Sequence, residues 1–517
     1  MEASGPFISV AMPTYETEPR HLREAVGSVL GQTNSNWELC IVDDGSQRAD
    51  TLRALRRLGS RDSRVTTRML DRNSGISNAT NEALSLCRGE LVAFLDHDDA
   101  LAPEALEEVS RAFARHEFDV AYSDSDKLTA SGERTDPFHK PDWSPVYALG
   151  AMYVGHLLVV RRSLLEQCGG LDPAFDTIQD FELLLRLSEL TDRIHHIPRV
   201  LYHWRAIPGS IAADADAKPG VPELQARAVN EHLRRQGIAA EAVPHEGIPH
   251  RTRLRPQGRP ERPAVSVVIP SRGGAERTLA AVRERTAYES FEVIVEAAEG
   301  SFRPAALANR GLDRANGEYL VFLGEDIEVT EPDWIERLLL YTEMPGVGAA
   351  GPTLVHPDGR VSASGMAIGL YDPAVPAMRG FEAGGDGYYG SLSVAREVSA
   401  IGMECMLVRR SDFEAVGGFE QAYRRQFHDH DLCLRMRSRG LSVICAPGPT
   451  TIDHATEARR RSDFDVIDRA LFVDRWWDRL AAGDPFYSSS FFRAAADYSL
   501  PPFGGDALEL ALRETVG

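Results

Sequence analysis

Two acids that directly follow an apolar segment are the first candidates for chemistry in this chain. Asp96 and Asp98 come after the apolar run 90–95, and a single residue separates them. Carboxylates in this arrangement can hold a hard divalent cation through oxygen ligands while the cation binds two phosphates. Two acids near a turn are more often a solvated loop or a helix cap, so the pair needs support from other residues.

Further polar residues follow two other predicted strands. The segment 13–16 comes after an apolar run over about 7–12, and Asp43 and Asp44 end a second run over about 38–43. The two acids can form a tight turn with a helix cap, or they can accept hydrogen bonds from a base and a ribose. Both readings stay open from the sequence.

Two single residues further along the chain could complete such a site. Asp180 lies in the first turn of a predicted helix, where it is either a capping carboxylate or a general base that takes a proton from an incoming hydroxyl. His203, in the segment 200–205, is an ordinary strand histidine unless it lies near the same edge. There its imidazole could bind the metal.

The predicted elements bring these clusters to one place. Strand-like runs alternate with helical patterns in a spacing that is typical of βαβ units, and such units form a parallel sheet covered by helices. The strands are expected at about 7–12, 38–43, 65–70 and 90–95, and the helices at about 20–31, 48–59 and 76–88. Ligands of these sheets bind at the carboxyl ends of the strands, where all three polar clusters fall.

The chain also repeats itself. The segment 6–14 returns as 263–271, and 88–96 returns as 316–324. A repeat of about 250 residues indicates a duplicated domain, and 517 residues exceed the usual size of a single core. We therefore expect two α/β modules in tandem: a first module at 1–215, a connector helix and linker at 216–262, a second module at 263–485 and a C-terminal tail at 486–517.

Taken in order, these motifs resemble inverting family 2 glycosyltransferases of the GT-A fold. The likeness spans nearly the whole chain and is carried by Pro-Thr-Tyr at 13–15, Val-Asp-Asp-Gly-Ser at 42–46, the segment 73–81, Asp-His-Asp-Asp at 96–99, Gln-Asp at 179–180 and Tyr-His-Trp-Arg at 202–205. The segments 140–145, 200–205 and 429–435 more narrowly resemble two-module O-antigen and rhamnan-type polysaccharide transferases. The resemblance implies transfer of a sugar from a nucleoside-diphosphate sugar, for example dTDP-rhamnose or a UDP-sugar. The acceptor would be a hydroxyl of a growing, lipid-linked surface polysaccharide, and the transfer would proceed with inversion.

The resemblance also implies a role for each site residue. Asp180 would be the catalytic base, and Asp98 and His203 would bind Mn²⁺ or Mg²⁺. The nucleotide sugar would contact Pro13, Thr14, Tyr15, Glu16, Asp43, Asp44, Asn73, Asp96, His97 and Arg205. Arg205 is included because it stands close to His203 and could neutralise the diphosphate.

The second copy departs from this pattern. Asp326, Asp429 and His454 correspond to the metal ligand, the base and the late histidine, but Gly324 replaces Asp96 and the paired acids of 43–44 are lost. From Ser9 to Asp98 is 89 positions, whereas from Ser266 to Asp326 is 60, so we expect a helix–strand unit to be missing. These changes favour a second site that is altered or slow. The alternative is a module that binds glycan or serves as a scaffold without catalysis.

Composition narrows the possible partners and the compartment. With 57 Lys and Arg against 77 Asp and Glu, the net charge of −20 excludes nonspecific binding of nucleic acid. Six scattered cysteines, the absence of a signal-peptide pattern and apolar runs far shorter than ~20 residues predict a cytoplasmic protein. Contact with the inner face of the membrane or with transport machinery would then be peripheral. A sugar nucleotidyltransferase is disfavoured because 13–18 lacks the Gly-rich, basic phosphate loop of that class.

Overall fold

The chain folds into two compact units. The computed structural model describes residues 5–59, 62–206, 220–258, 262–456, 458–459 and 463–501. The first unit comprises Met1–Trp143, Met152–Gly237 and Ala242–Thr252, and the second comprises Ser144–Ala151, Ile238–Glu241 and Arg253–Gly517. The expected boundary at 215–216 and the end of the tail at 502–517 lie outside the described residues. Helix α8 (Val221–Arg235), which we expected in a connector, belongs to the first unit.

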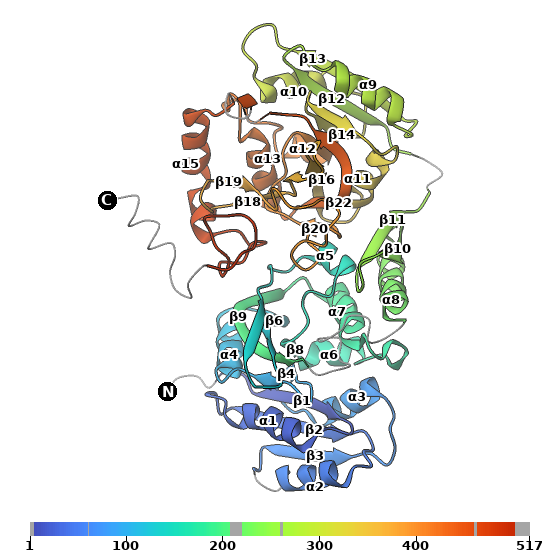
Figure 1. Cartoon of the computed structure of the whole chain (residues 1–517), viewed down its shortest axis with the longest axis vertical. Coiled ribbons are helices and arrows are strands. Elements are labelled where there is room, and N and C mark those ends of the chain that lie inside the picture. Colours follow the sequence, from blue (N-terminus) through green and yellow to red (C-terminus); the bar gives the residue numbers. More distant parts are fainter. Residues whose placement is uncertain are drawn as a thin grey trace, which may run out of the picture. The chain divides into compact units, whose positions relative to one another are not determined.

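The sheet of the first unit has the strand order β3-β2-β1-β4-β8-β6-β9-β5, with β7 paired to β6 (Figure 1). Strands β3, β2, β1 and β4 are parallel, whereas β8 is antiparallel to both of its neighbours. The strands are β1 (Ile8–Thr14), β2 (Trp37–Asp43), β3 (Val65–Met69), β4 (Leu91–Phe94), β5 (Ala100–Leu101), β6 (Val120–Leu128), β7 (Arg134–Phe138), β8 (Leu158–Arg161) and β9 (Ile194–Arg205). The expected α/β architecture with crossover helices is confirmed.

Amphipathic helices cover this sheet. In α4 (Ala105–Arg115) the apolar residues Leu106, Val109 and Phe113 recur at helical spacing and are buried in the same core as β1 and β4. The other helices of the unit are α1 (Pro19–Leu30), α2 (Ala49–Leu58), α3 (Ile76–Leu86), α6 (Arg162–Cys168) and α7 (Gln179–Leu190). Helix α3 packs on β1 and β2, which places its N-terminus at the carboxyl edge of the sheet.

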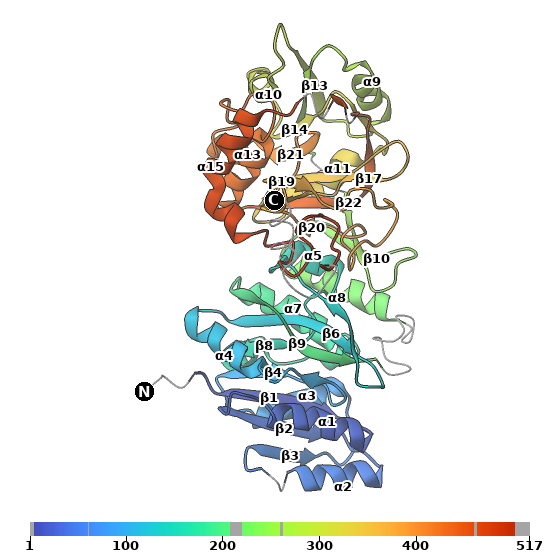
Figure 2. The ribbon, with the colours of Figure 1, turned by 60° about the vertical axis from the view of Figure 1, so that its left-hand side comes forward.

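The second unit repeats this topology. Its sheet has the order β13-β12-β14-β21-β16-β22-β15, with β17 paired to β16 and β20 to β22. Figure 2 labels β13, β14, β21 and β22 of this sheet. The strands are β12 (Val265–Ser271), β13 (Phe291–Ala297), β14 (Tyr319–Leu323), β15 (Ile327–Val329), β16 (Val347–Val355), β17 (Val361–Ala363), β20 (Arg396–Glu397), β21 (Cys405–Arg409) and β22 (Ser442–Asp453). Two short sheets lie outside these: β10 (Ala240–Pro244) pairs with β11 (Thr252–Pro256), and β18 (Met366–Ile368) with β19 (Ala374–Pro376).

The predicted loss of a helix–strand unit is confirmed. In the first unit, α2 and β3 stand between β2 and α3. In the second unit residues 298–303, all of them described, lead directly from β13 into α10 (Pro304–Leu312). Its remaining helices are α5 (Pro145–Gly150), α9 (Glu276–Arg285), α11 (Trp334–Thr342), α12 (Arg410–Ala415), α13 (His428–Arg437) and α15 (Val466–Ala482). Within the described residues, no helix has the length and apolar character needed to cross a membrane.

Candidate active site

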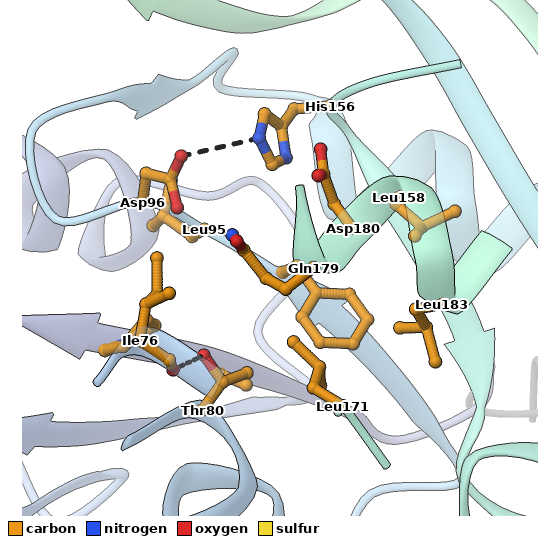
Figure 3. Close-up of a pocket in the computed structure, with 13 residues that line it drawn as sticks. Ile76, Thr80, Leu95, Asp96, His156, Leu158, Leu171, Gln179, Asp180 and Leu183 are labelled. Carbon is orange, nitrogen blue, oxygen red and sulfur yellow. Dashed lines mark hydrogen bonds and ion pairs between the residues drawn. The ribbon is translucent and has the colours of Figure 1, made fainter. Parts of the chain in front are cut away.

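A pocket in the first unit opens at the carboxyl ends of β1 and β4 (Figure 3). It encloses about 430 Å³ of empty space, counting its open mouth. Its wall is mostly apolar, and its polar side chains carry two carboxylates, one amide, one imidazole and one hydroxyl. The lining residues are Ala11, Pro13, Ile76, Thr80, Phe94, Leu95, Asp96, His156, Leu158, Leu171, Gln179, Asp180 and Leu183.

Asp180, the predicted base, lies in the pocket wall at the first turn of α7. Its Oδ1 accepts a hydrogen bond of 2.9 Å from the Phe181 backbone N–H. Removal of water from the carboxylate raises the pKa of Asp180, the charge of His156 opposes this rise, and Asp96 adds to it. A raised pKa makes a carboxylate a better proton acceptor at neutral pH.

His156 is a pocket residue that sequence reasoning missed. Its Nε2 lies 3.4 Å from Asp96 Oδ2, and Figure 3 shows the ring between Asp96 and Asp180. The ring stacks on Tyr202 at 4.9 Å, and its buried Nδ1 has no hydrogen-bond partner among the described residues. The pairing of β8 with β4 is the feature that would identify this residue. In the antiparallel register Ala93↔Val159, the positions of Asp96 and His156 fall opposite each other just beyond the paired residues.

Lys140 holds the backbone that carries this histidine. Its Nζ donates to the carbonyl oxygens of Val154, at 2.5 Å, and His156, at 2.7 Å. The side chain is almost completely buried, and loss of hydration lowers the pKa of Lys140 to about 7, although Asp124 opposes the shift. The sequence identified Lys140 as part of a motif but gave it no role.

The structure gives His203 an environment that fits a metal ligand. Its Nδ1 lies 2.6 Å from Asp126 Oδ1, and Arg134 Nε donates to the other oxygen of this buried carboxylate. A carboxylate that accepts the Nδ1 proton leaves the Nε2 lone pair for a cation, as is usual for metal-bound histidines. Strand pairing sets His203 opposite Ala100, two residues after Asp98.

Asp98 has a partly exposed carboxylate, and the His97 Nδ1 lies 3.8 Å from its Oδ1. Among the described residues, no three His, Cys, Asp or Glu side chains form a cluster that could hold a metal by themselves. A cation held by Asp98 and His203 would therefore need further ligands, such as the oxygens of a bound diphosphate and water.

Arg205 corrects one expectation. The sequence placed this guanidinium at the diphosphate, but the side chain is 2% exposed and forms an ion pair with Glu24 at 2.8 Å. Its Nε donates to the Asp98 carbonyl, and its backbone N–H donates to Asp99. Arg205 therefore stabilises the loop 96–99 through these hydrogen bonds. Burial, Asp96 and Asp98 raise the pKa of Asp99 well above its usual range, and Tyr202 Oη donates to it at 2.6 Å.

The paired acids at the end of β2 are buried and engaged with neighbouring loops. Asp43 accepts hydrogen bonds from the backbone N–H and the hydroxyl of Ser46. Asp44 accepts from the backbone and hydroxyl of Ser74 and from the Gly75 N–H. Each carboxylate thus shapes the loops around the predicted nucleotide site, and direct bonds to a base or ribose stay a prediction.

The other predicted nucleotide contacts lie on the loops after β1 and before α3. Glu16 accepts from the Gln47 N–H at 2.6 Å, and the Thr14 hydroxyl bonds that of Thr17. Tyr15 and Asn73 are exposed, as a ligand-binding loop requires. Pro13 and Asp96 line the pocket itself.

In the second unit the predicted base has a different environment. Asp429 is buried in the first turn of α13 and accepts from the Met403 N–H at 2.9 Å. Burial alone would raise the pKa of Asp429, but His430 and His428 outweigh it, so the pKa is lowered. The His430 Nδ1 lies 3.4 Å from the carboxylate.

The residues of the predicted second metal pair are neighbours, since the His454 N–H donates to the Asp326 carbonyl at 3.0 Å, but their side chains have other partners. Asp326 Oδ1 accepts from the Arg459 guanidinium at 3.0 Å, and His454 Nε2 lies 2.8 Å from Glu328 Oε2. Each side chain is engaged with a different residue, so we no longer expect Asp326 and His454 to share a cation. The physical reason is charge, because a guanidinium already neutralises the carboxylate that a cation would bind.

Comparison with known protein families identifies the family of this chain. The model of the family described as Glycosyl transferase family 2 matches residues 9–169 and again 255–417. Each match begins in or just before the first strand of one unit's sheet, so the duplication is also visible at the level of the family. The chain belongs to glycosyl transferase family 2.

Several relatives match nearly the whole chain. The O-antigen biosynthesis protein RfbC of Myxococcus xanthus is 34% identical over 539 residues, which cover 98% of this chain and 42% of RfbC. The uncharacterized protein y4gI of Sinorhizobium fredii is 34% identical over 538 residues, or 96% of this chain and 59% of that protein. The chain thus spans about half the length of these relatives. A structure of S. aureus TarS with UDP-GlcNAc is 20% identical, has a TM-score of 0.37, and covers 44% of this chain and 66% of TarS 1–349.

Proposed function

We propose that the first unit transfers a sugar from a nucleoside-diphosphate sugar to a hydroxyl group of a glycan acceptor, with inversion at the anomeric carbon. Membership of glycosyl transferase family 2 supports the reaction class. The observation that carries the proposal is the convergence of Asp96, His156 and Asp180 on one pocket at the carboxyl edge of the sheet.

Asp180 would be the base in this reaction. Its carboxylate accepts the proton of the acceptor hydroxyl while the hydroxyl oxygen forms a bond to the anomeric carbon. The bond from that carbon to the diphosphate breaks on the opposite side, and the nucleoside diphosphate leaves with the electron pair. A single in-line displacement inverts the configuration, and its rate depends on how well Asp180 is aimed.

His156 would position the charges around this base. It lies between the carboxylates of Asp96 and Asp180, which would otherwise repel each other across the pocket. Lys140 fixes its backbone carbonyl, and Tyr202 fixes the plane of its ring. We assign His156 a positioning role, because its charge acts on the reaction through Asp180.

Asp98 and His203 would hold a divalent cation, Mn²⁺ or Mg²⁺. When bound, such a cation supplies positive charge to the departing diphosphate. The Asp126 carboxylate would keep the His203 imidazole in the orientation and tautomer that a ligand needs.

The acceptor is proposed to be a growing surface polysaccharide, including one carried on a lipid. The name of RfbC, an O-antigen biosynthesis protein, and its 34% identity support this class of acceptor. The chain would then work in the cytoplasm, in peripheral contact with the membrane that holds the acceptor.

The test is a screen of nucleoside-diphosphate sugars with the purified chain, Mn²⁺ and a panel of glycan acceptors. We expect release of nucleoside diphosphate from at least one donor, and an NMR spectrum that shows the inverted anomer in the product. Failure of every donor to bind or react, or retention of the anomeric configuration, would refute the proposal.

A further inference from the structure

The strand-end acids of the second unit, Glu325 and Asp326, are already paired with a cation of the chain itself. The Arg459 guanidinium donates to Asp326 Oδ1 at 3.0 Å through one terminal nitrogen and to Glu325 Oε1 through the other. Asp326 stands at the position of Asp98, in the loop 324–326 that joins β14 to β15. A planar guanidinium that bridges two carboxylates is a specific and strong arrangement.

Glu325 is committed to the fold on its other side. Its Oε2 accepts from the Ser271 hydroxyl at 2.8 Å and from the backbone N–H groups of Arg272 and Gly274. These bonds draw the loop after β12 against the end of β14. Among the described residues of the first unit, no hydrogen bond joins the corresponding loop, 14–17, to the acids at 96–98, and the family resemblance assigns this loop to the nucleotide.

A divalent cation would have to displace Arg459 to reach Asp326. Without a cation, the two acids and one guanidinium carry a net negative charge, which repels a diphosphate. The Nε2 of His454 is not free to bind a cation in the present arrangement, because it lies 2.8 Å from Glu328 Oε2. Gly324, at the position of Asp96, contributes no side chain.

We propose that Arg459 occupies the place of the metal ion in the second unit, so that the chain carries one cation-dependent donor site, in the first unit. This inference rests on the donor site proposed for the first unit. It implies that the second unit kept the fold of the duplicated sheet, whereas Arg459 took the place of the donor-site cation.

The test counts bound Mn²⁺ by electron paramagnetic resonance in the full-length chain, with UDP, dTDP or GDP as the added nucleotide. We expect one Mn²⁺ per chain in the wild type and none in Asp98→Asn. The double variant Asp98→Asn/Arg459→Ala should bind one Mn²⁺, because removal of the guanidinium frees Glu325 and Asp326. Further substitution of Asp326→Asn should abolish that site.

Two matched variants control for charge and for folding. Arg459→Lys keeps a cation at the same place, and in the Asp98→Asn background it should bind no Mn²⁺. Arg469→Ala removes another arginine of the second unit, one that pairs with Asp372, and should likewise create no site. Thermal unfolding of each variant verifies that the second unit is folded.

The outcomes separate the two proposals. The inference is overturned if Asp98→Asn still binds Mn²⁺ and Asp326→Asn abolishes that binding. It is also overturned if Asp98→Asn/Arg459→Ala is folded but gains no Mn²⁺ site. If Asp98→Asn leaves the count unchanged while Arg459→Ala raises it by one, the inference about Arg459 holds and the donor site proposed for the first unit is refuted.

Discussion

The two units share a scaffold and differ at the end of the same strand. In both, a serine of the first strand accepts from a glycine N–H and donates to a glutamate: Ser9, Gly89 and Glu38 in one, Ser266, Gly317 and Glu292 in the other. A Cβ atom on either glycine would lie within 2.6 Å of the serine backbone nitrogen. The same packing constraint has thus survived the duplication.

The charged side chains at the pocket, in contrast, differ between the two units. The first unit places Asp96, His156 and Asp180 together, whereas the equivalent positions of the second unit hold Gly324, Glu404 and Asp429. The pair Ala93↔Val159 in the first unit corresponds to Val321↔Leu407 in the second, so the strand register is the same and the side chains have changed. The comparison teaches that buried packing and polar chemistry can diverge independently within one fold.

The strongest test of this comparison is Asp180→Asn. We expect donor turnover to fall about 10²–10⁴-fold, because the amide cannot accept the acceptor's proton. Release of nucleoside diphosphate measures the loss, and thermal unfolding shows that α7 is intact. Asp192→Asn, an exposed acid of the same unit, serves as the control. Turnover equal to that of the wild type would remove Asp180 from the mechanism.

A smaller effect is expected from Asp126→Asn. The variant weakens the acceptor of the His203 Nδ1 proton, and loss of such a partner lowers metal affinity about 10–100-fold. Titration of the chain with Mn²⁺ in the presence of a nucleoside diphosphate measures the change. Asp136→Asn, on the same hairpin but exposed, should bind as the wild type does. Identical affinities of the two variants would contradict the role given to His203.

The pair His156→Gln and Asp96→Asn should move the pH profile in opposite directions. Activity needs ionised Asp180, so turnover falls as the pH drops through its pKa. His156 lowers that pKa and Asp96 raises it, so the acid limb should shift to higher pH in His156→Gln and to lower pH in Asp96→Asn. The position of the limb, and not the maximal rate, is the measurement. A shift in the same direction for both would refute the charge arrangement.

The smallest effect concerns Gly324→Ala in the second unit. The nearest neighbour of a Cβ there is an Ile327 side-chain carbon at 3.3 Å, so we expect a loss of stability within about 1 kcal/mol. The matched variant Gly317→Ala meets the Ser266 backbone nitrogen and should cost about 1–3 kcal/mol. Urea unfolding compares them. Equal costs would mean that packing, and not chemistry, excludes a side chain at the position of Asp96.

Much of the architecture was predictable from local patterns. The alternation of strands and helices, the internal repeat and the shortened second copy all follow from residue order, because strand periodicity and segment spacing are properties of neighbouring residues. The same patterns placed Asp96 at the end of β4 and Asp180 at the start of α7, and both line the pocket.

The site partners that come from distant segments were not predictable in the same way. His156 meets Asp96 because β8 runs antiparallel to β4, and Arg205 turns away from the pocket because Glu24 lies behind it. The segment Ser144–Ala151 belongs to the second unit although the repeat assigned it to the first copy. Such pairings depend on which segments pack together over long sequence separations.

By itself, the sequence determined the family, the number of modules and the edge of the sheet at which the candidate site lies. Tertiary structure alone decided which charges meet there: His156 with Asp96 in the first unit, and Arg459 with Glu325 and Asp326 in the second. The physical reason is the short range of hydrogen bonds and ion pairs. Their partners are set by folded positions separated by 60 to more than 130 residues along the chain.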